Sequence, residues 1–218
     1  MKQKYIHEIE TFGEEIASAI THGIGAALSV VGLTLLLIWA ARLEDGWRLV
    51  SVSIYGGALV FLYLASTLYH AIQHLATKRV FHILDHVGIF LLIAGTYTPI
   101  LLLKMRDWQG WLFFGLIWGL ALVGLTVKAF FTGRFVHVST FAYVAMGWSS
   151  LFLVNTLSAT LGTGGMAWLV AGGLSYSLGV IPFLWERLPF NHAIWHLFVI
   201  GGSVCHYVLI WRYVLPLG

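Results

Sequence analysis

The chain has 218 residues, of which 59% are hydrophobic and 10% are charged. Soluble domains carry about 25% charged residues, so this chain has too little charge to cover a water-exposed surface, and we expect a polytopic membrane protein. The net charge of +3 is spread over loops and forms no basic patch, which argues against a nucleic-acid-binding protein.

Charged and turn residues divide the chain into seven apolar stretches, each near the length of about 20 residues that crosses a bilayer. We expect spans at residues 17–41, 49–72, 80–103, 111–127, 137–157, 166–185 and 191–214. A glycine-rich turn, Gly162, Gly164 and Gly165, precedes the sixth span. The sequence therefore predicts an all-α fold, with residues 1–218 forming one integral membrane bundle of seven transmembrane helices.

The distribution of Lys and Arg predicts the orientation of the bundle. On the N-terminal side of the membrane we expect seven such residues: Lys2, Lys4, Lys78, Arg79, Lys128, Arg134 and Arg187. On the other side we expect five: Arg42, Arg48, Lys104, Arg106 and Arg212. The excess favours an N-terminus in the cytoplasm and a C-terminus outside.

The histidines are concentrated at one face of the predicted bundle. Nine of the ten fall on or near the N-terminal side: His7, His22, His70, His74, His82, His86, His137, His192 and His196. The tenth, His206, lies 14 residues beyond His192 in the same span, about 20 Å deeper at the helical rise. Ionisable groups inside membrane segments are costly and indicate function, so this layer predicts a functional site near one face.

Metal binding is the interpretation that this layer favours. His192 and His196 share a helix face, Asp85 is the one acidic residue inside any span after the first, and Ser66 lies one turn before His70. These residues predict three imidazoles and a water molecule held by Asp85. The His-x3-His spacing occurs three times, at His70/His74, His82/His86 and His192/His196, so spacing alone leaves the ligand set open; His74, His82 and His137 are more typical of interfacial residues.

Four motifs in order carry a family resemblance: Glu15-x2-Ser18-x3-His22, Ser66-x3-His70, Asp85-His86 and His192-x3-His196. This set resembles the hemolysin III family, the bacterial branch of the progestin and adipoQ receptor family. It is also similar to the wider superfamily of membrane hydrolases that includes alkaline ceramidases. The eukaryotic receptors usually have Asn where this chain has Ser18, a departure that leaves the metal site intact but weakens any receptor-type interpretation.

The resemblance implies Zn²⁺ bound by His70, His192 and His196, with Asp85 holding the zinc water and Ser66 beside it. It gives Glu15 and His22 no defined role beyond polar packing near the site. It also implies a cytoplasmic N-terminus and, for a bacterial chain, a multi-pass protein of the inner (cell) membrane.

Three histidines and an open coordination position are typical of catalytic zinc, and Asp85 could act as general base. Residues 138–185 contain no charged side chain, so the cavity they wall suits an acyl chain. We therefore expect hydrolysis of a lipid amide or ester, with the bilayer and a fatty-acyl substrate as partners and Asp85 and Ser66 as catalytic residues. Alternatives are a non-catalytic lipid sensor or regulator with structural zinc, a transporter or channel, and a cytolytic protein; no feature of the sequence indicates an oligomeric state.

Overall fold

The computed structural model describes residues 10–216, which form a bundle of long helices. In chain order these are α1 (Phe12–Arg42), α2 (Gly46–Ala71), α3 (Leu75–Lys104), α4 (Trp108–Phe131), α5 (Val136–Trp148), the 3₁₀ segment η2 (Ser149–Leu153), α6 (Val154–Leu184), α7 (Asn191–Leu209) and the π-helical turn η3 (Ile210–Val214). The predicted all-α membrane bundle is confirmed. His7, named in the histidine layer, lies outside the described residues.

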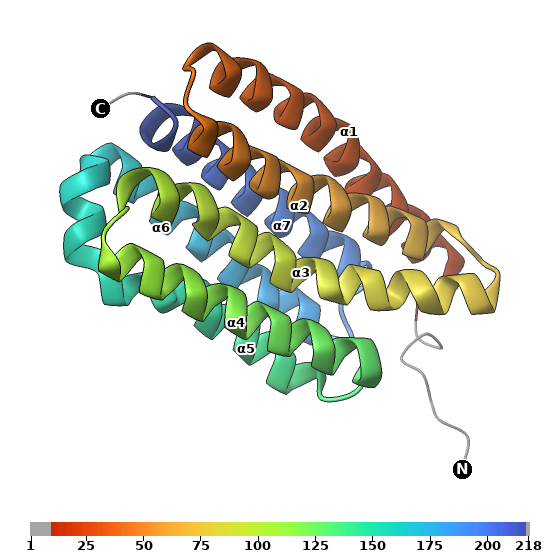
Figure 1. The fold of residues 1–218 in the computed structure, drawn as a ribbon. Coiled ribbons are helices and arrows are strands. Elements are labelled where there is room, and N and C mark those ends of the chain that lie inside the picture. The colour runs from red at the N-terminus through yellow and green to blue at the C-terminus, as the bar shows by residue number, and fades with distance from the viewer. Residues whose placement is uncertain (1–9, 217–218) are drawn as a thin grey trace.

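Helix α3 lies across the middle of the bundle, with α1 and α2 on one side and α4 and α5 on the other (Figure 1). Of the candidate membrane spans, α3 has the largest share of its apolar stretch buried inside the bundle. Helices α6 and α7 pack against each other behind α3 in this view. Helix α1 begins at one end of the bundle and α7 finishes at the other.

The outer surface of the bundle is apolar, as lipid contact requires. On α4, for example, Leu112, Leu116, Leu120 and Val123 are all exposed. Six helical stretches are long and apolar enough to cross a membrane, and one of them, residues 136–184, is 49 residues long and contains both α5 and α6. The described chain therefore has six to seven candidate spans.

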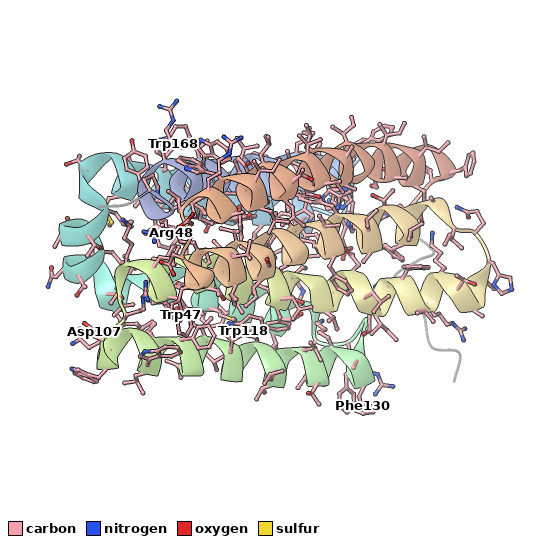
Figure 2. The ribbon with its side chains drawn as sticks, turned by 45° about the horizontal axis from the view of Figure 1, so that its top comes forward. Trp47, Arg48, Asp107, Trp118, Phe130 and Trp168 are labelled. Atoms are coloured by element: carbon pink, nitrogen blue, oxygen red, sulfur yellow. The ribbon has the colours of Figure 1, made fainter. Side chains whose placement is uncertain are left out.

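Two aspartates that were expected between spans cap the N-termini of α2 and α4. Asp45 accepts a hydrogen bond from the Trp47 backbone N–H at 2.9 Å, and Asp107 accepts one from Gly110 at the same distance. These bonds satisfy N–H groups that have no partner within the helix. Trp47 and Asp107 lie near one end of the bundle, opposite Phe130 (Figure 2).

The connection between the second and third predicted spans is shorter than expected. Helix α2 ends at Ala71 and α3 begins at Leu75, whereas we predicted a break from residue 73 to residue 79. Lys78 therefore lies inside α3. Asp85 lies ten residues after the start of this helix, whereas the predicted span placed it five residues after its start. These additional helical residues at the start of α3 are possible because the buried ammonium group of Lys78 pairs with the Glu15 carboxylate of α1.

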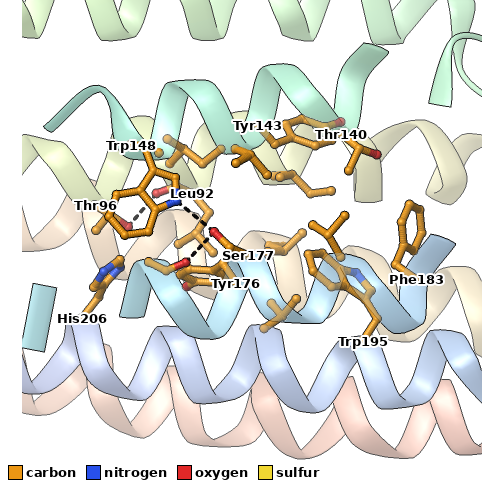
Figure 3. Close-up of a pocket in the computed structure, with 18 of the residues that line it drawn as sticks. Leu92, Thr96, Thr140, Tyr143, Trp148, Tyr176, Ser177, Phe183, Trp195 and His206 are labelled. Atoms are coloured by element: carbon orange, nitrogen blue, oxygen red, sulfur yellow. Dashed lines mark hydrogen bonds between the residues drawn. The ribbon is translucent and has the colours of Figure 1, made fainter. Parts of the chain in front are cut away.

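The predicted fifth and sixth spans differ most from the structure. Helix α5 ends at Trp148 instead of continuing to Leu157, because the Tyr97 hydroxyl bonds the backbone there: it accepts from the Ser150 N–H at 2.8 Å and lies 2.7 Å from the Gly147 carbonyl oxygen. Helix α6 begins at Val154, and of the three turn glycines only Gly162 leaves the helical conformation, with φ 64°. Thr140 and Phe183 lie towards one side of the close-up, and Trp148 and Tyr176 towards the other, so α5 and the second part of α6 run antiparallel (Figure 3).

Candidate metal centre

Three histidines from two helices meet inside the bundle. His70 of α2 and His192 and His196 of α7 each offer a ring nitrogen, and the three nitrogens lie within 4.8 Å of one another. The ring planes of the three pairs are inclined by 71°, 75° and 88°. The lone pair of an imidazole nitrogen lies in its ring plane, so three steeply inclined rings can direct their nitrogens to one point. The cluster could therefore hold a metal ion.

The second nitrogen of each ring faces an oxygen atom that can only accept a hydrogen bond. His70 Nδ1 lies 3.0 Å from Glu15 Oε2, and His192 Nδ1 lies 3.0 Å from Glu10 Oε1. His196 Nδ1 lies 3.2 Å from the Ser18 carbonyl oxygen and 3.1 Å from Thr21 Oγ1, a hydroxyl that donates its own hydrogen to the Ala17 or Ser18 carbonyl oxygen and so accepts from His196. An ionised carboxylate or a carbonyl accepts only, so Nδ1 carries the proton in each ring. Nε2 then carries none and is the atom able to bind a metal.

These acceptors all come from α1 or from the residue before its N-cap. Thr11 and Glu14 form a capping box: Thr11 Oγ1 accepts from the Glu14 N–H at 3.3 Å, and Glu14 Oε2 accepts from the Thr11 N–H at 2.8 Å. Glu14 Oε1 also accepts from the Phe190 N–H at 2.9 Å. Because Phe190 directly precedes α7, this bond ties the start of α1 to the start of the helix that carries His192.

A buried lysine balances the carboxylates. Lys78 Nζ lies 2.8 Å from Glu15 Oε1. Glu10, Glu15 and His70 form a second group with metal-ligand spacing, but the Lys78 ammonium already supplies the positive charge beside it. Burial alone would raise the pKa of Glu10, yet the hydrogen bond from His192 and the electrostatic interactions with His192 and His70 hold that pKa below its usual value. Glu10 is therefore an ionised acceptor at neutral pH.

Asp85 lies beside the three-histidine cluster and not within its ligand group. It is 7% exposed, interacts electrostatically with His192, and lines the same cavity as His192 and His196. The Ser66 hydroxyl is fully buried and close enough to interact with the Asp85 carboxyl, although the two do not meet the geometry of a hydrogen bond. Asp85 thus lies where it can contact a water molecule or ligand next to the cluster, with Ser66 buried behind it and not on the cavity wall.

An apolar cavity extends from the cluster along the bundle. At one end it is lined by Asp85 and His192, and its far end reaches Ile100 and His206. His192 and His206 are 14 residues apart on one helical stretch, so the cavity is roughly 20 Å long. Figure 3 shows Tyr143 and Trp148 of α5 on one side of this cavity and Tyr176 and Trp195 on the other.

The remaining predicted histidines lie outside the cluster. His74 and His137 are exposed, and His74 is the N-cap of α3, so the His70/His74 spacing does not fall on one helix. His82 stacks on Tyr69 at 4.9 Å and packs edge-on against His86 at 4.5 Å. Of the three His-x3-His pairs, only His192/His196 contributes both members to the cluster.

Comparison with known proteins decides the family. Residues 11–207 match the family model described as Haemolysin-III related. This chain belongs to the haemolysin-III-related family. The resemblance carried by the four sequence motifs is thereby confirmed.

The haemolysin-III-related chain is similar to proteins from bacteria and mammals. It is 47% identical over 216 residues to Hemolysin-3 of Bacillus cereus, covering 99% of both chains. It is 46% identical to the Hemolysin-3 homolog of Bacillus subtilis (strain 168), over 93% of this chain and 95% of that one. It is 34% identical to the human Monocyte to macrophage differentiation factor, over 92% of this chain and 84% of that one. It is thus a multi-pass membrane protein with bacterial homologues.

Sequence analysis did not identify several residues of the site. Glu10 was not singled out, Lys78 was counted only among the charges between spans, and Glu15 was expected only to pack near the site. The only available signal was the density of carboxylates just before the first span. Nothing in the spacing connects Glu10 with His192, because these residues are separated by almost the whole chain.

Proposed function

We propose that this protein is a zinc-dependent membrane hydrolase that cleaves an amide or ester bond of an acyl lipid near the cytoplasmic face of the bacterial inner membrane. The observation that carries the proposal is the three-histidine cluster at one end of an apolar cavity that Asp85 also lines. We also propose that the chain crosses the membrane seven times, with α5 and α6 as separate crossings.

The donor set fits zinc. His70, His192 and His196 offer three neutral imidazole nitrogens and no thiolate, since Cys205 lies deep in α7, away from the cluster. Imidazole ligands suit zinc among the common metals, and three protein ligands leave the open position typical of catalytic sites. When bound there, zinc supplies Lewis-acid chemistry: it polarises a carbonyl and activates water.

The protein's own residues would hold the reacting groups and move the proton. The Asp85 carboxylate is on the cavity wall next to His192, so it can accept a proton from a water molecule in the cavity. The buried Ser66 hydroxyl is close enough to interact with that carboxylate and to help hold it in place. The apolar walls along α3, α5 and α6 exclude bulk water and accommodate an acyl chain.

The test begins with metal analysis of the purified protein, of His196→Ala and of His74→Ala. We expect about one zinc per chain in the first, loss of zinc in His196→Ala, and retention in His74→Ala, because His74 is exposed and outside the cluster. Asp85→Asn should keep zinc but lose at least about a hundredfold in the hydrolysis rate of lipid amides or esters, the usual range for a general base. Full activity in Asp85→Asn, or no zinc in the unsubstituted protein, would contradict the proposal.

A non-catalytic protein with structural zinc is the second candidate. The ligands come from α2 and α7 and their acceptors from α1 and the residue before its N-cap, so one ion would tie three helices together and contribute to folding. In that case chelation would lower the unfolding temperature, and no lipid would be cleaved by any variant. Lipid hydrolysis by the zinc-loaded protein separates the two functions.

A further inference from the structure

His22 has an environment that the metal cluster does not explain. It lies on α1, is 3% exposed, and neither ring nitrogen has a hydrogen-bond partner among the residues that the structure describes. A neutral imidazole has one donor and one acceptor nitrogen. Leaving both unsatisfied in the interior of a protein costs free energy, so a polar group from outside the described chain should satisfy at least one of them.

His22 is not aimed at the metal. Its ring is stacked on that of His196, with centroids 3.4 Å apart and planes inclined by only 11°. Nitrogen lone pairs in two nearly parallel, separated planes do not converge on one ion. The ligand rings, by contrast, are inclined by 71° or more to one another. His22 therefore lies against the cluster without being a member of it.

The neighbours of His22 also leave its nitrogens available. Tyr63 packs edge-on against the ring at 4.9 Å, but its hydroxyl donates to Ser203 at 2.8 Å. Ser18, one helical turn earlier on α1, is completely buried, and its hydroxyl too has no hydrogen-bond partner among the described residues. A small polar patch, Ser18 and His22, is thus formed on the α1 side of the site.

The cavity connects this patch to the proposed ligand. His22 lines it together with Asp85, His192 and His196. No other residue of α1 lines this cavity, so His22 is the point at which α1 can contact a molecule held there.

We propose that His22 contacts the ligand: its neutral imidazole hydrogen-bonds the polar head of an acyl lipid whose chain occupies the apolar cavity. The inference rests on the proposed function for the kind of ligand but not on cleavage. Because the acceptor nitrogen needs a donor, the preferred head carries an N–H or O–H hydrogen. A head with acceptor oxygens only would satisfy one nitrogen of the ring.

The test measures lipid binding without turnover, in an Asp85→Asn background. The probes are N-palmitoylethanolamine, which has N–H and O–H donors, and methyl palmitate, which has the same acyl chain and no donor. Binding is measured by the shift in unfolding temperature as lipid is added. His22→Phe keeps the ring stacking on His196 and removes both nitrogens, whereas His22→Asn keeps one donor and one acceptor.

We expect His22→Phe to keep its zinc and its unfolding temperature without lipid, and to bind N-palmitoylethanolamine about tenfold more weakly, the effect of one lost hydrogen bond. Methyl palmitate binding should change less, and His22→Asn should recover part of the affinity. Loss of zinc in His22→Phe would instead make His22 a ligand, and a lower unfolding temperature with unchanged lipid affinity would make it a packing residue; either result overturns the proposal. The proposal is also overturned if neither lipid binds to the protein that retains His22.

A different result separates this inference from the proposed function. If the protein that retains Asp85 binds lipid but does not hydrolyse it, only the proposed function is contradicted.

Discussion

The orientation of the three cluster histidines depends on oxygen atoms of α1 and of the residue before its N-cap. Glu10, Glu15 and the Ser18 carbonyl each face one Nδ1 atom, at 3.0 to 3.2 Å. Carboxylates and carbonyls in this position fix the imidazole tautomer and the ring angle and increase the basicity of the metal-binding nitrogen. The acidic start of α1 is thus part of the candidate metal centre, although it contributes none of the three histidines.

The Glu15–His70 pair gives a prediction at the residue scale. Glu15→Gln replaces an ionised acceptor with a neutral amide, so we expect zinc affinity to fall by roughly 10- to 100-fold, as for other residues that support metal-binding histidines. Affinity is measured by competition with a chelator of known zinc affinity. The exposed Glu186→Gln is the control, with no expected change.

The Glu15 variant also leaves buried Lys78 without its partner, which by itself destabilises the fold. The double variant Glu15→Gln/Lys78→Met removes that charge. It should regain much of the lost unfolding temperature but none of the lost zinc affinity. Normal zinc affinity in both variants would show that Glu15 serves only the ion pair with Lys78.

At the scale of helices, the spacing between α2 and α3 sets the distance between the cluster and Asp85. His70 is on α2 and Asp85 on α3, and glycines allow the two helices to approach closely. A Cβ atom on Gly95 of α3 would lie 2.9 Å from Ala58 Cβ on α2. Helices in a membrane gain no hydrophobic driving force from packing together, so they associate through the close van der Waals contacts that small residues allow.

Gly95→Ala should therefore destabilise the bundle by about 1–3 kcal/mol, the usual cost of overpacking. The matched control is Gly57→Ala on α2, where an added Cβ would meet nothing within 4 Å. Alanine is preferred over glycine within helices by up to about 1 kcal/mol, so the control should be neutral or slightly stabilising. Unfolding temperature in detergent measures both, and equal effects of the two substitutions would refute the close-packing argument.

The helix ends illustrate how far local sequence determines an element. Asp45 and Asp107 cap α2 and α4 with bonds to residues two or three positions later, so the sequence contains the whole signal. The early start of α3 has no such local signal, because it depends on Lys78 reaching Glu15 on another helix. The end of α5 likewise depends on Tyr97 of α3.

At the scale of the whole molecule, the direction of each crossing is the property to test. In a Cys205→Ser background, single cysteines replace Leu75, Trp108, Phe152 or Trp185, four exposed residues near helix ends. Seven crossings with a cytoplasmic N-terminus predict that a membrane-impermeant maleimide labels positions 108 and 152 in intact cells. Positions 75 and 185 should react only after the membrane is permeabilised.

The cysteine at position 152 distinguishes six spans from seven. If residues 136–184 crossed the membrane once, position 152 would lie in the bilayer and remain unlabelled, and position 185 would be labelled from outside. The inverse pattern at positions 75 and 108 would contradict the predicted orientation.

The sequence by itself determined that this is an all-α membrane bundle of the haemolysin-III-related family with a histidine layer. Helix length and apolarity are local quantities, set by the transfer of each segment from water to lipid, and can be evaluated one segment at a time. The resemblance also named His70, His192 and His196, the three residues that the fold brings together.

Only the tertiary structure decided which polar groups meet around those three. Glu10 faces His192, Lys78 faces Glu15, and His22 stacks on His196. Each of these contacts joins segments far apart in the chain, and each depends on the rotation and offset of one helix against another. Those quantities come from packing of the whole bundle, including its glycine contacts, so no single segment specifies them.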